Sequence, residues 1–151
     1  VLSNYGHTDL AYTLLCRKEY PSWLYSVNKG ATTIWEHWDG IMENGEFWST
    51  DMNSFNHYAY GSVADWVYEK AAGICLQEEK PGFSGVKIEP HTDKRLGWLE
   101  ASIETAYGKI QSSWTYVGDQ VRYDIKVPIP ASVIISGTET EVEAGEYTFW
   151  S

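Results

Sequence analysis

One short segment of the sequence places a carboxylate and an imidazole between two indoles. In "GATTIWEHWDG" (residues 30–40), Trp35 and Trp38 flank Glu36 and His37, and a glycine stands at each end. Indole faces stack on the apolar faces of sugar rings, and a partly dehydrated carboxylate can act as a general acid or base. A site for sugar chemistry is therefore one interpretation of the segment. The alternative is an ordinary loop in which the tryptophans pack inward and Glu36 faces water.

A histidine is the second candidate. His57 stands in "MNSFNHYAYG", at the start of a stretch whose apolar residues recur at helical spacing. Its imidazole could donate a hydrogen bond to a sugar hydroxyl. It could equally be a histidine that bonds to the backbone where a helix begins. The residue types alone leave both roles open.

Other kinds of chemistry have no motif here. The histidines show no HExxH pattern and no pairing with cysteines, so we expect no metal site. A phosphate-binding loop, a dinucleotide fingerprint and a G-x-S-x-G nucleophile motif are also absent, and we expect no cofactor. Cys16 and Cys75 are too few for a disulfide framework, and small buried hydrophobic side chains are the favoured interpretation.

Composition limits the partners. The 151 residues carry a net charge of −10, which argues against nucleic acids and anionic membranes. No apolar run approaches the roughly 18 to 20 residues that cross a bilayer. The hydrophobic content of 43% is enough to build a core.

The first part of the chain has helical periodicity. We expect a helix from Thr8 or Asp9, as N-cap, up to Pro21, and a short second helix that ends at Gly30. The apolar stripe within residues 54–72 predicts a third and clearer helix. Residues 31–53 between them have no clear period, and loops of this length are usually functional or belong to something larger. The helical part therefore resembles an incomplete domain.

From about Lys80 the period changes to two. Alternating segments near residues 99–103, 110–116, 121–127, 133–136 and 147–150 predict strands, and Gly118-Asp119 predicts a hairpin turn. Short strands with such turns are typical of an antiparallel β-sandwich. The charged segment 77–83, with Pro-Gly, is the predicted linker. We thus expect a helical domain over residues 1–76 and a β-sandwich over residues 77–151.

A series of ordered motifs resembles one known family. The motifs are "NYGHTDLAYTLL" from Asn4, "EYPSWLYSVNKGATTIWEHWDG" (19–40), "MNSFNHYAYGSVADWVYEKAAGI" (52–74), "PGFSGVKIEP" (81–90) and "LGWLEASIETAYGKIQSSW" (96–114). Together they resemble the C-terminal end of the bacterial α-L-rhamnosidases of glycoside hydrolase family 78. The likeness covers the chain up to about Trp114 and is loose beyond it. The extra Tyr5 departs from the usual opening motif.

The resemblance implies both a fold and a reaction. It implies an α+β fragment, with the last helices of an (α/α)6 catalytic barrel followed by a C-terminal antiparallel β-sandwich. It also implies an inverting hydrolase that releases terminal α-L-rhamnose from glycosides or polysaccharides. Glu36 would be its general base and His57 a contact to the sugar, with Trp35 and Trp38 as candidate sugar-binding residues. The general acid would lie upstream, so the fragment alone is expected to be inactive.

Two further expectations concern surfaces. Helices cut from a barrel would lose their neighbours, so we expect self-association through the helical half. A different class of function stays open: a non-catalytic carbohydrate-binding or structural β-sandwich with a helical preface. In that case Trp98, Trp114 and Trp150 could form a sugar platform, although tryptophans in strands more often belong to the core.

Overall fold

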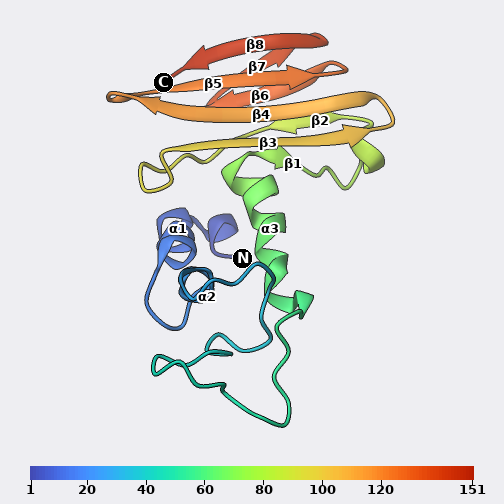
Figure 1. The fold of residues 1–151 in the computed structure, drawn as a ribbon. Coiled ribbons are helices and arrows are strands. Elements are labelled where there is room, and N and C mark those ends of the chain that lie inside the picture. Colours follow the sequence, from blue (N-terminus) through green and yellow to red (C-terminus); the bar gives the residue numbers. More distant parts are fainter. The chain divides into compact units, whose positions relative to one another are not determined.

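The chain folds into two compact units. A computed structural model describes residues 1–151 in full, and the units are Val1–Ala64 and Asp65–Ser151. The first unit holds helices and a long irregular loop, and the second is built mainly of β-strands (Figure 1). This α+β organisation confirms the expected order of helices before strands. The domain limit expected between residues 76 and 77 stays a prediction.

The first unit begins with three short helical segments. They are the 3-10 turn η1 (Ser3–Tyr5), α1 (Thr8–Cys16) and α2 (Trp23–Asn28). The residue before α1 is His7, so the predicted N-cap at Thr8 or Asp9 is wrong by at least one position. Ser22 caps α2 by accepting a hydrogen bond from Tyr25 N at 3.0 Å, and Gly30 follows with φ +87° as the expected left-handed residue.

The third helix starts later than its sequence pattern indicates. It consists of the 3-10 segment η2 (Tyr58–Ser62), α3 (Val63–Trp66) and the π-helical turn η3 (Val67–Ala71). Residues 54–57, included in the predicted helix, lie outside it because they bond to another part of the unit. The predicted apolar stripe is also not a buried face, since Tyr58 is 89% exposed.

The second unit contains two four-stranded sheets. One has the order β1-β2-β6-β7 and the other the order β3-β4-β5-β8. All pairs are antiparallel except β2 with β6, which is parallel. The bounds are β1 (Ile74–Cys75), β2 (Val86–Ile88), β3 (Trp98–Thr105), β4 (Gly108–Val117), β5 (Gln120–Val127), β6 (Ala131–Ile135), β7 (Thr138–Val142) and β8 (Gly145–Trp150).

The five predicted strands correspond to β3, β4, β5, β6 and β8, and Gly118-Asp119 joins β4 to β5. The sequence pattern missed β1, β2 and β7. Because β1 pairs with β2, segment 77–83 connects two strands of the second unit, with a 3-10 turn η4 at Pro81–Phe83.

Alternating side chains of the two sheets form the core of the second unit. The fully buried members include Ile88, Ile110, Trp114, Ile125 and Val133. Two inward side chains of β4 also bond to the end of the preceding helix. Ser112 Oγ donates to Ala72 O at 2.6 Å and Trp114 Nε1 donates to Ala71 O at 2.8 Å, which satisfies buried helix-terminal carbonyls. Trp114 is therefore a core residue, whereas Trp98 and Trp150 are 66% and 51% exposed.

Neither cysteine forms a disulfide. Cys16 and Cys75 are both half-buried thiols. Burial raises the pKa of the Cys75 thiol, and its Sγ lies 3.4 Å from Gly73 O. A thiol held protonated is a poor nucleophile, in agreement with the expected packing role. None of the helices has the length and apolar content of a membrane span.

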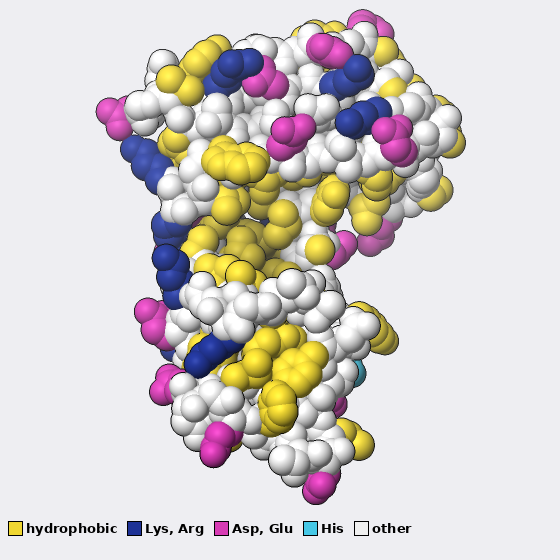
Figure 2. Space-filling model, viewed as in Figure 1, with side chains coloured by type: hydrophobic (Ala, Val, Ile, Leu, Met, Phe, Trp, Pro, Cys, Tyr) yellow, Lys and Arg dark blue, Asp and Glu magenta, His cyan; other side chains and the backbone are white.

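The exposed apolar side chains of the first unit generate a prediction. Leu10 and Leu14 lie one turn apart on α1 and are 47% and 42% exposed, and Tyr58 is more exposed still. Hydrophobic side chains also reach the surface of this unit in Figure 2. Contiguous patches larger than a few hundred Å² are rare on stable monomers. We expect the chain by itself to self-associate in sedimentation velocity, with a weight-average mass that rises with concentration, and to bind a hydrophobic dye.

The matched variant Leu10→Glu/Leu14→Glu should shift the chain toward monomer and reduce dye fluorescence several-fold. Leu76→Glu, at an exposed leucine of the second unit, serves as the control. A wild-type chain that is monomeric at all concentrations and does not bind dye would contradict the expectation.

Candidate functional site

Two segments far apart in the sequence are joined by backbone hydrogen bonds. Glu36 N donates to Ser54 O at 2.9 Å, and His57 N donates to Ile34 O at 2.8 Å. Thr33 Oγ1 adds a bond to Phe55 O. This pairing closes the loop of residues 37–53. It also brings both sequence-predicted polar residues, Glu36 and His57, onto one pair of neighbouring segments.

Glu36 is half-buried and is held by its own loop. Its Oε2 accepts a hydrogen bond from Ser54 N at 3.3 Å, so Ser54 bonds to Glu36 through both its backbone N and its backbone O. The side chain has no ion-pair partner among the observed salt bridges of the chain. A carboxylate without a cationic partner keeps its lone pairs available to accept a proton, as a general base must.

Trp35 is buried within the loop. It is 6% exposed and packs edge-on against Phe55, with ring centroids 5.1 Å apart. Gly40 lies over this pair so closely that an added Cβ would be 3.1 Å from Phe55 and 3.2 Å from Trp35. Asn53 Nδ2 donates to Gly40 O at 2.7 Å, and its buried Oδ1 makes no hydrogen bond.

Aromatic contacts hold the other side of the loop. Trp38 stacks on Tyr60 with centroids 4.1 Å apart, and Trp23 packs edge-on against Trp38 at 5.1 Å. Trp23 Nε1 donates to Tyr60 O at 2.9 Å, which fixes this group to α2. His37 stacks on Trp48 at 3.7 Å. Aromatic stacking thus takes the place of regular secondary structure in this loop.

These contacts bear on the two predicted sugar-binding tryptophans. One edge or face of each ring is already in contact with protein, namely Phe55 for Trp35 and Tyr60 and Trp23 for Trp38. A direct contact of either indole with a sugar stays a prediction. Both residues nevertheless help to fix the backbone on either side of Glu36.

His57 lies at the start of η2 and caps it. Its Nδ1 accepts a hydrogen bond from Ala59 N at 3.4 Å, and its ring lies parallel to that of Tyr58 at 5.8 Å. Because Nδ1 faces the backbone, Nε2 is the ring atom left to meet a ligand.

A small hollow lies among the aromatic side chains of this loop. It has a volume of about 50 Å³ and is lined by Trp23, Ser26, Val27, Thr33, Ile34, Trp35, His37, Trp38 and Tyr60. It is far smaller than the roughly 300–1,000 Å³ of enclosed ligand pockets. Glu36 and His57 do not line it, so we interpret the hollow as a gap in aromatic packing. The chain also has no group of three or more His, Cys, Asp or Glu side chains placed to hold a metal ion.

Several residues of this region were not singled out from the sequence. They are Trp23, Trp48, Asn53, Ser54 and Tyr60. The high aromatic content, 15% of the chain, was the available signal, but spacing could not show which rings stack.

Comparison with known proteins identifies the class of both units. Residues 1–71 match the model of the bacterial α-L-rhamnosidase six-hairpin glycosidase domain, and residues 73–148 match that of the bacterial α-L-rhamnosidase C-terminal domain. The fold class is therefore part of a six-hairpin glycosidase domain followed by a C-terminal β domain, as the resemblance implied.

Individual relatives agree with this class. An α-L-rhamnosidase of Alteromonas sp. (strain LOR) is 43% identical over 133 residues, which are 88% of this chain and 14% of the relative. One of Streptomyces avermitilis is 43% identical over 114 residues, or 76% of this chain and 11% of the relative. The chain belongs to the family of bacterial α-L-rhamnosidases and spans about one seventh or less of the length of these two relatives.

Solved structures give the same result. The S. avermitilis α-L-rhamnosidase complexed with L-rhamnose superposes with a TM-score of 0.89 at 33% identity, over 99% of this chain and 16% of that one. The native α-L-rhamnosidase of Aspergillus terreus superposes with a TM-score of 0.90 at 34% identity, over 99% of this chain and 18% of that one.

The close packing around Gly40 generates a prediction. In Gly40→Ala the new methyl group would press on the rings of Trp35 and Phe55 and on Asn53 Oδ1. Overpacking of this kind costs about 1–3 kcal/mol. We expect a lower urea midpoint and faster hydrogen exchange at the amides of Glu36 and His57. Gly61→Ala is the matched control, because its methyl would lie at an ordinary 3.5 Å from Ile34, and it should be neutral or slightly stabilising. Equal effects of the two substitutions would contradict this interpretation.

Proposed function

We propose that this chain supplies one side of the active site of an inverting glycoside hydrolase that releases terminal α-L-rhamnose from glycosides or polysaccharides. Glu36 is its general base. The observation that carries the proposal is the backbone pairing that sets Glu36, half-buried and without an ionic partner, beside the segment of His57. Family membership supports the reaction, and one similar structure is a complex with L-rhamnose.

The inverting reaction needs two carboxyl groups on opposite faces of the sugar. A general acid protonates the glycosidic oxygen as the bond breaks, while the base removes a proton from the water that attacks the anomeric carbon. The two groups are about 6.5–9.5 Å apart in such enzymes, which leaves room for the water. Glu36 deprotonates this water. We assign the general acid to a part of a longer polypeptide outside these 151 residues, because the chain spans only 14% of its Alteromonas relative.

His57 binds the sugar in this proposal. With Nδ1 engaged by Ala59 N, its Nε2 is directed to a hydroxyl of rhamnose. The loop aromatics Trp35 and Trp38 fix the position of Glu36, and a direct contact of either with the sugar is part of the same proposal. No cofactor and no metal ion take part in the reaction as we propose it.

The role of Glu36 predicts a large loss of turnover. In the longer enzyme, Glu36→Gln keeps the shape of the side chain but removes the base, so kcat for p-nitrophenyl α-L-rhamnoside should fall by about two to four orders of magnitude. The matched control is Glu43→Gln, which changes an exposed carboxylate of the same loop and should leave kcat within about twofold. The 151-residue chain alone should show no turnover. A near-normal kcat for Glu36→Gln, with an unchanged melting temperature, would place the base elsewhere.

The role of His57 predicts an effect on binding that a purely structural role would not give. Asparagine is a good N-cap, so His57→Asn keeps a capping acceptor at the start of η2 while it removes Nε2. We expect the KM for the same substrate to rise about tenfold or more, which corresponds to one lost hydrogen bond, with little change in melting temperature. An unaltered KM together with a lower melting temperature would leave His57 with the capping role only.

A further inference from the structure

The outward face of the β3-β4-β5-β8 sheet carries two exposed indoles in one row. Trp98 pairs with Thr115, Thr115 with Arg122 and Arg122 with Trp150 across the four strands. Directly paired residues point to the same side of a sheet, so both indoles lie on the outward face. Their neighbours in sequence, Leu99 and Phe149, point inward, and Leu99 is buried. Three strand spacings put the two indoles roughly 14 Å apart.

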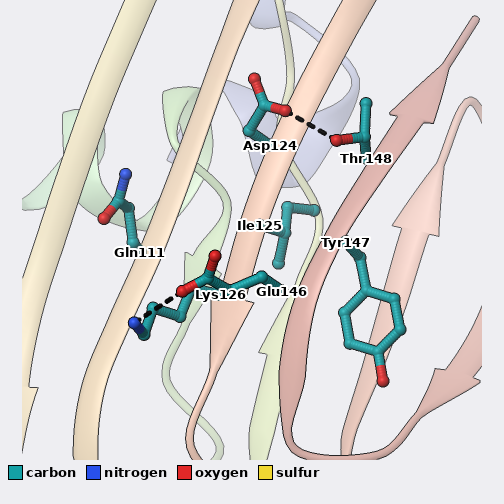
Figure 3. A pocket seen from close by; sticks show the side chains of 7 residues that line it. All are labelled: Gln111, Asp124, Ile125, Lys126, Glu146, Tyr147 and Thr148. Carbon is teal, nitrogen blue, oxygen red and sulfur yellow. Dashed lines mark hydrogen bonds and ion pairs between the residues drawn. The ribbon is translucent and has the colours of Figure 1, made fainter.

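Between and beside the indoles the face is densely polar. The next row contains Glu100, Ser113, Asp124 and Thr148, and the row after it contains Ser102, Gln111, Lys126 and Glu146. A shallow depression of about 230 Å³ lies over these rows. It is lined by Gln111, Asp124, Ile125, Lys126, Glu146, Tyr147 and Thr148 (Figure 3). It is therefore contiguous with the Arg122–Trp150 end of the indole row.

The charged side chains of these rows are paired except for Glu100, which is exposed and takes part in none of the ion pairs of the chain. Arg122 donates to Asp124 Oδ1 at 2.9 Å and Thr148 Oγ1 donates to the same oxygen at 2.8 Å. Lys126 pairs with Glu146 at 2.7 Å. Positive and negative side chains are accordingly mixed over the second unit in Figure 2. A surface whose cations are paired with carboxylates, on a chain of net charge −10, does not attract polyanions.

The ligand that fits these features is a neutral polyhydroxylated chain. Indoles stack on the apolar faces of sugar rings, and hydroxyl groups both donate and accept hydrogen bonds. The side chains in the depression offer both kinds of group: amide and ammonium donors on Gln111 and Lys126, and carboxylate acceptors on Asp124 and Glu146. The separation of the indoles matches an oligosaccharide rather than a single sugar. The depression is open and smaller than an enclosed ligand pocket, as is appropriate for a chain that passes across a surface.

We propose that this face is a non-catalytic binding site for a neutral glycan chain, with Trp98 and Trp150 as stacking residues and the depression at Asp124 and Thr148 as the polar subsite. Trp114 takes no part, because it is buried under the sheet. The site lies wholly in the second unit and does not depend on the assignment of Glu36. Its effect is to keep a polysaccharide bound to the protein independently of turnover.

Affinity electrophoresis of the 151-residue chain tests the proposal. The probes are the neutral polymers rhamnan, dextran and laminarin, and anionic polygalacturonate. We expect at least one neutral polymer to retard the chain and polygalacturonate to leave it unretarded. Trp98→Ala and Trp150→Ala should each weaken the retardation about tenfold, the size of one lost stacking contact. Both side chains are exposed, so circular dichroism and melting temperature should not change.

Two control variants establish whether the retardation arises at this face. Tyr107→Ala removes an aromatic residue of similar exposure from the turn between β3 and β4 and should bind as the wild type does. Glu43→Gln should also bind normally, since it alters an exposed carboxylate of the other unit. Retardation by none of the neutral polymers overturns the proposal. Retardation that the two tryptophan variants leave intact overturns it as well. The third contrary result is a change in the sedimentation of these variants without a change in retardation, which would make the face a contact between protein chains.

Discussion

Two backbone hydrogen bonds, from Glu36 N to Ser54 O and from His57 N to Ile34 O, hold the site region of the first unit together. They close a loop that has no helix and only one isolated bridge, between Ile41 and Phe47, to order it. Closing a long loop costs conformational entropy before any contact inside it forms. The bonds therefore need further support, and the aromatic contacts of the loop provide it.

Three ring pairs give much of that support. Trp35 with Phe55 packs under Gly40, Trp38 with Tyr60 ties the loop to the start of the third helix, and His37 with Trp48 orders its outer part. One ring of each pair lies within two residues of Glu36 in the sequence, and the Glu36 side chain is only half-buried. A base that must accept a proton from water needs this combination, in which the backbone is fixed and the side-chain oxygens stay accessible.

The sequence predicted the parts whose signals are local. Strand β5 is an example: Val121, Tyr123, Ile125 and Val127 are all buried, as their alternation with polar residues indicates. Strand β7, "TETEV", was missed because it is polar on both faces and so has no alternation to detect. Strands β1 and β2 were missed because they have only two and three residues.

Non-local contacts account for the other differences. Residues 54–57 have helical periodicity, yet the bonds to Ile34 and Glu36 keep them out of the helix and delay its start to Tyr58. The sequence motifs could suggest Glu36 and His57 as a pair, but not that Ser54 bonds to Glu36 or that Tyr60 stacks on Trp38. Likewise, the row from Trp98 to Trp150 exists only through the pairing of four strands, so no local pattern contains it.

The most direct test of the role of Glu36 is a crystal structure of the longer enzyme with L-rhamnose bound. We expect the Glu36 carboxylate on one face of the sugar and a second carboxyl group on the opposite face. The two groups should be about 6.5–9.5 Å apart, with a water molecule next to Glu36. A Glu36 side chain turned away from the sugar would contradict the assignment of the base. A separation of about 5–5.5 Å between the two carboxyl groups would contradict the inverting mechanism, since that spacing belongs to a retaining enzyme.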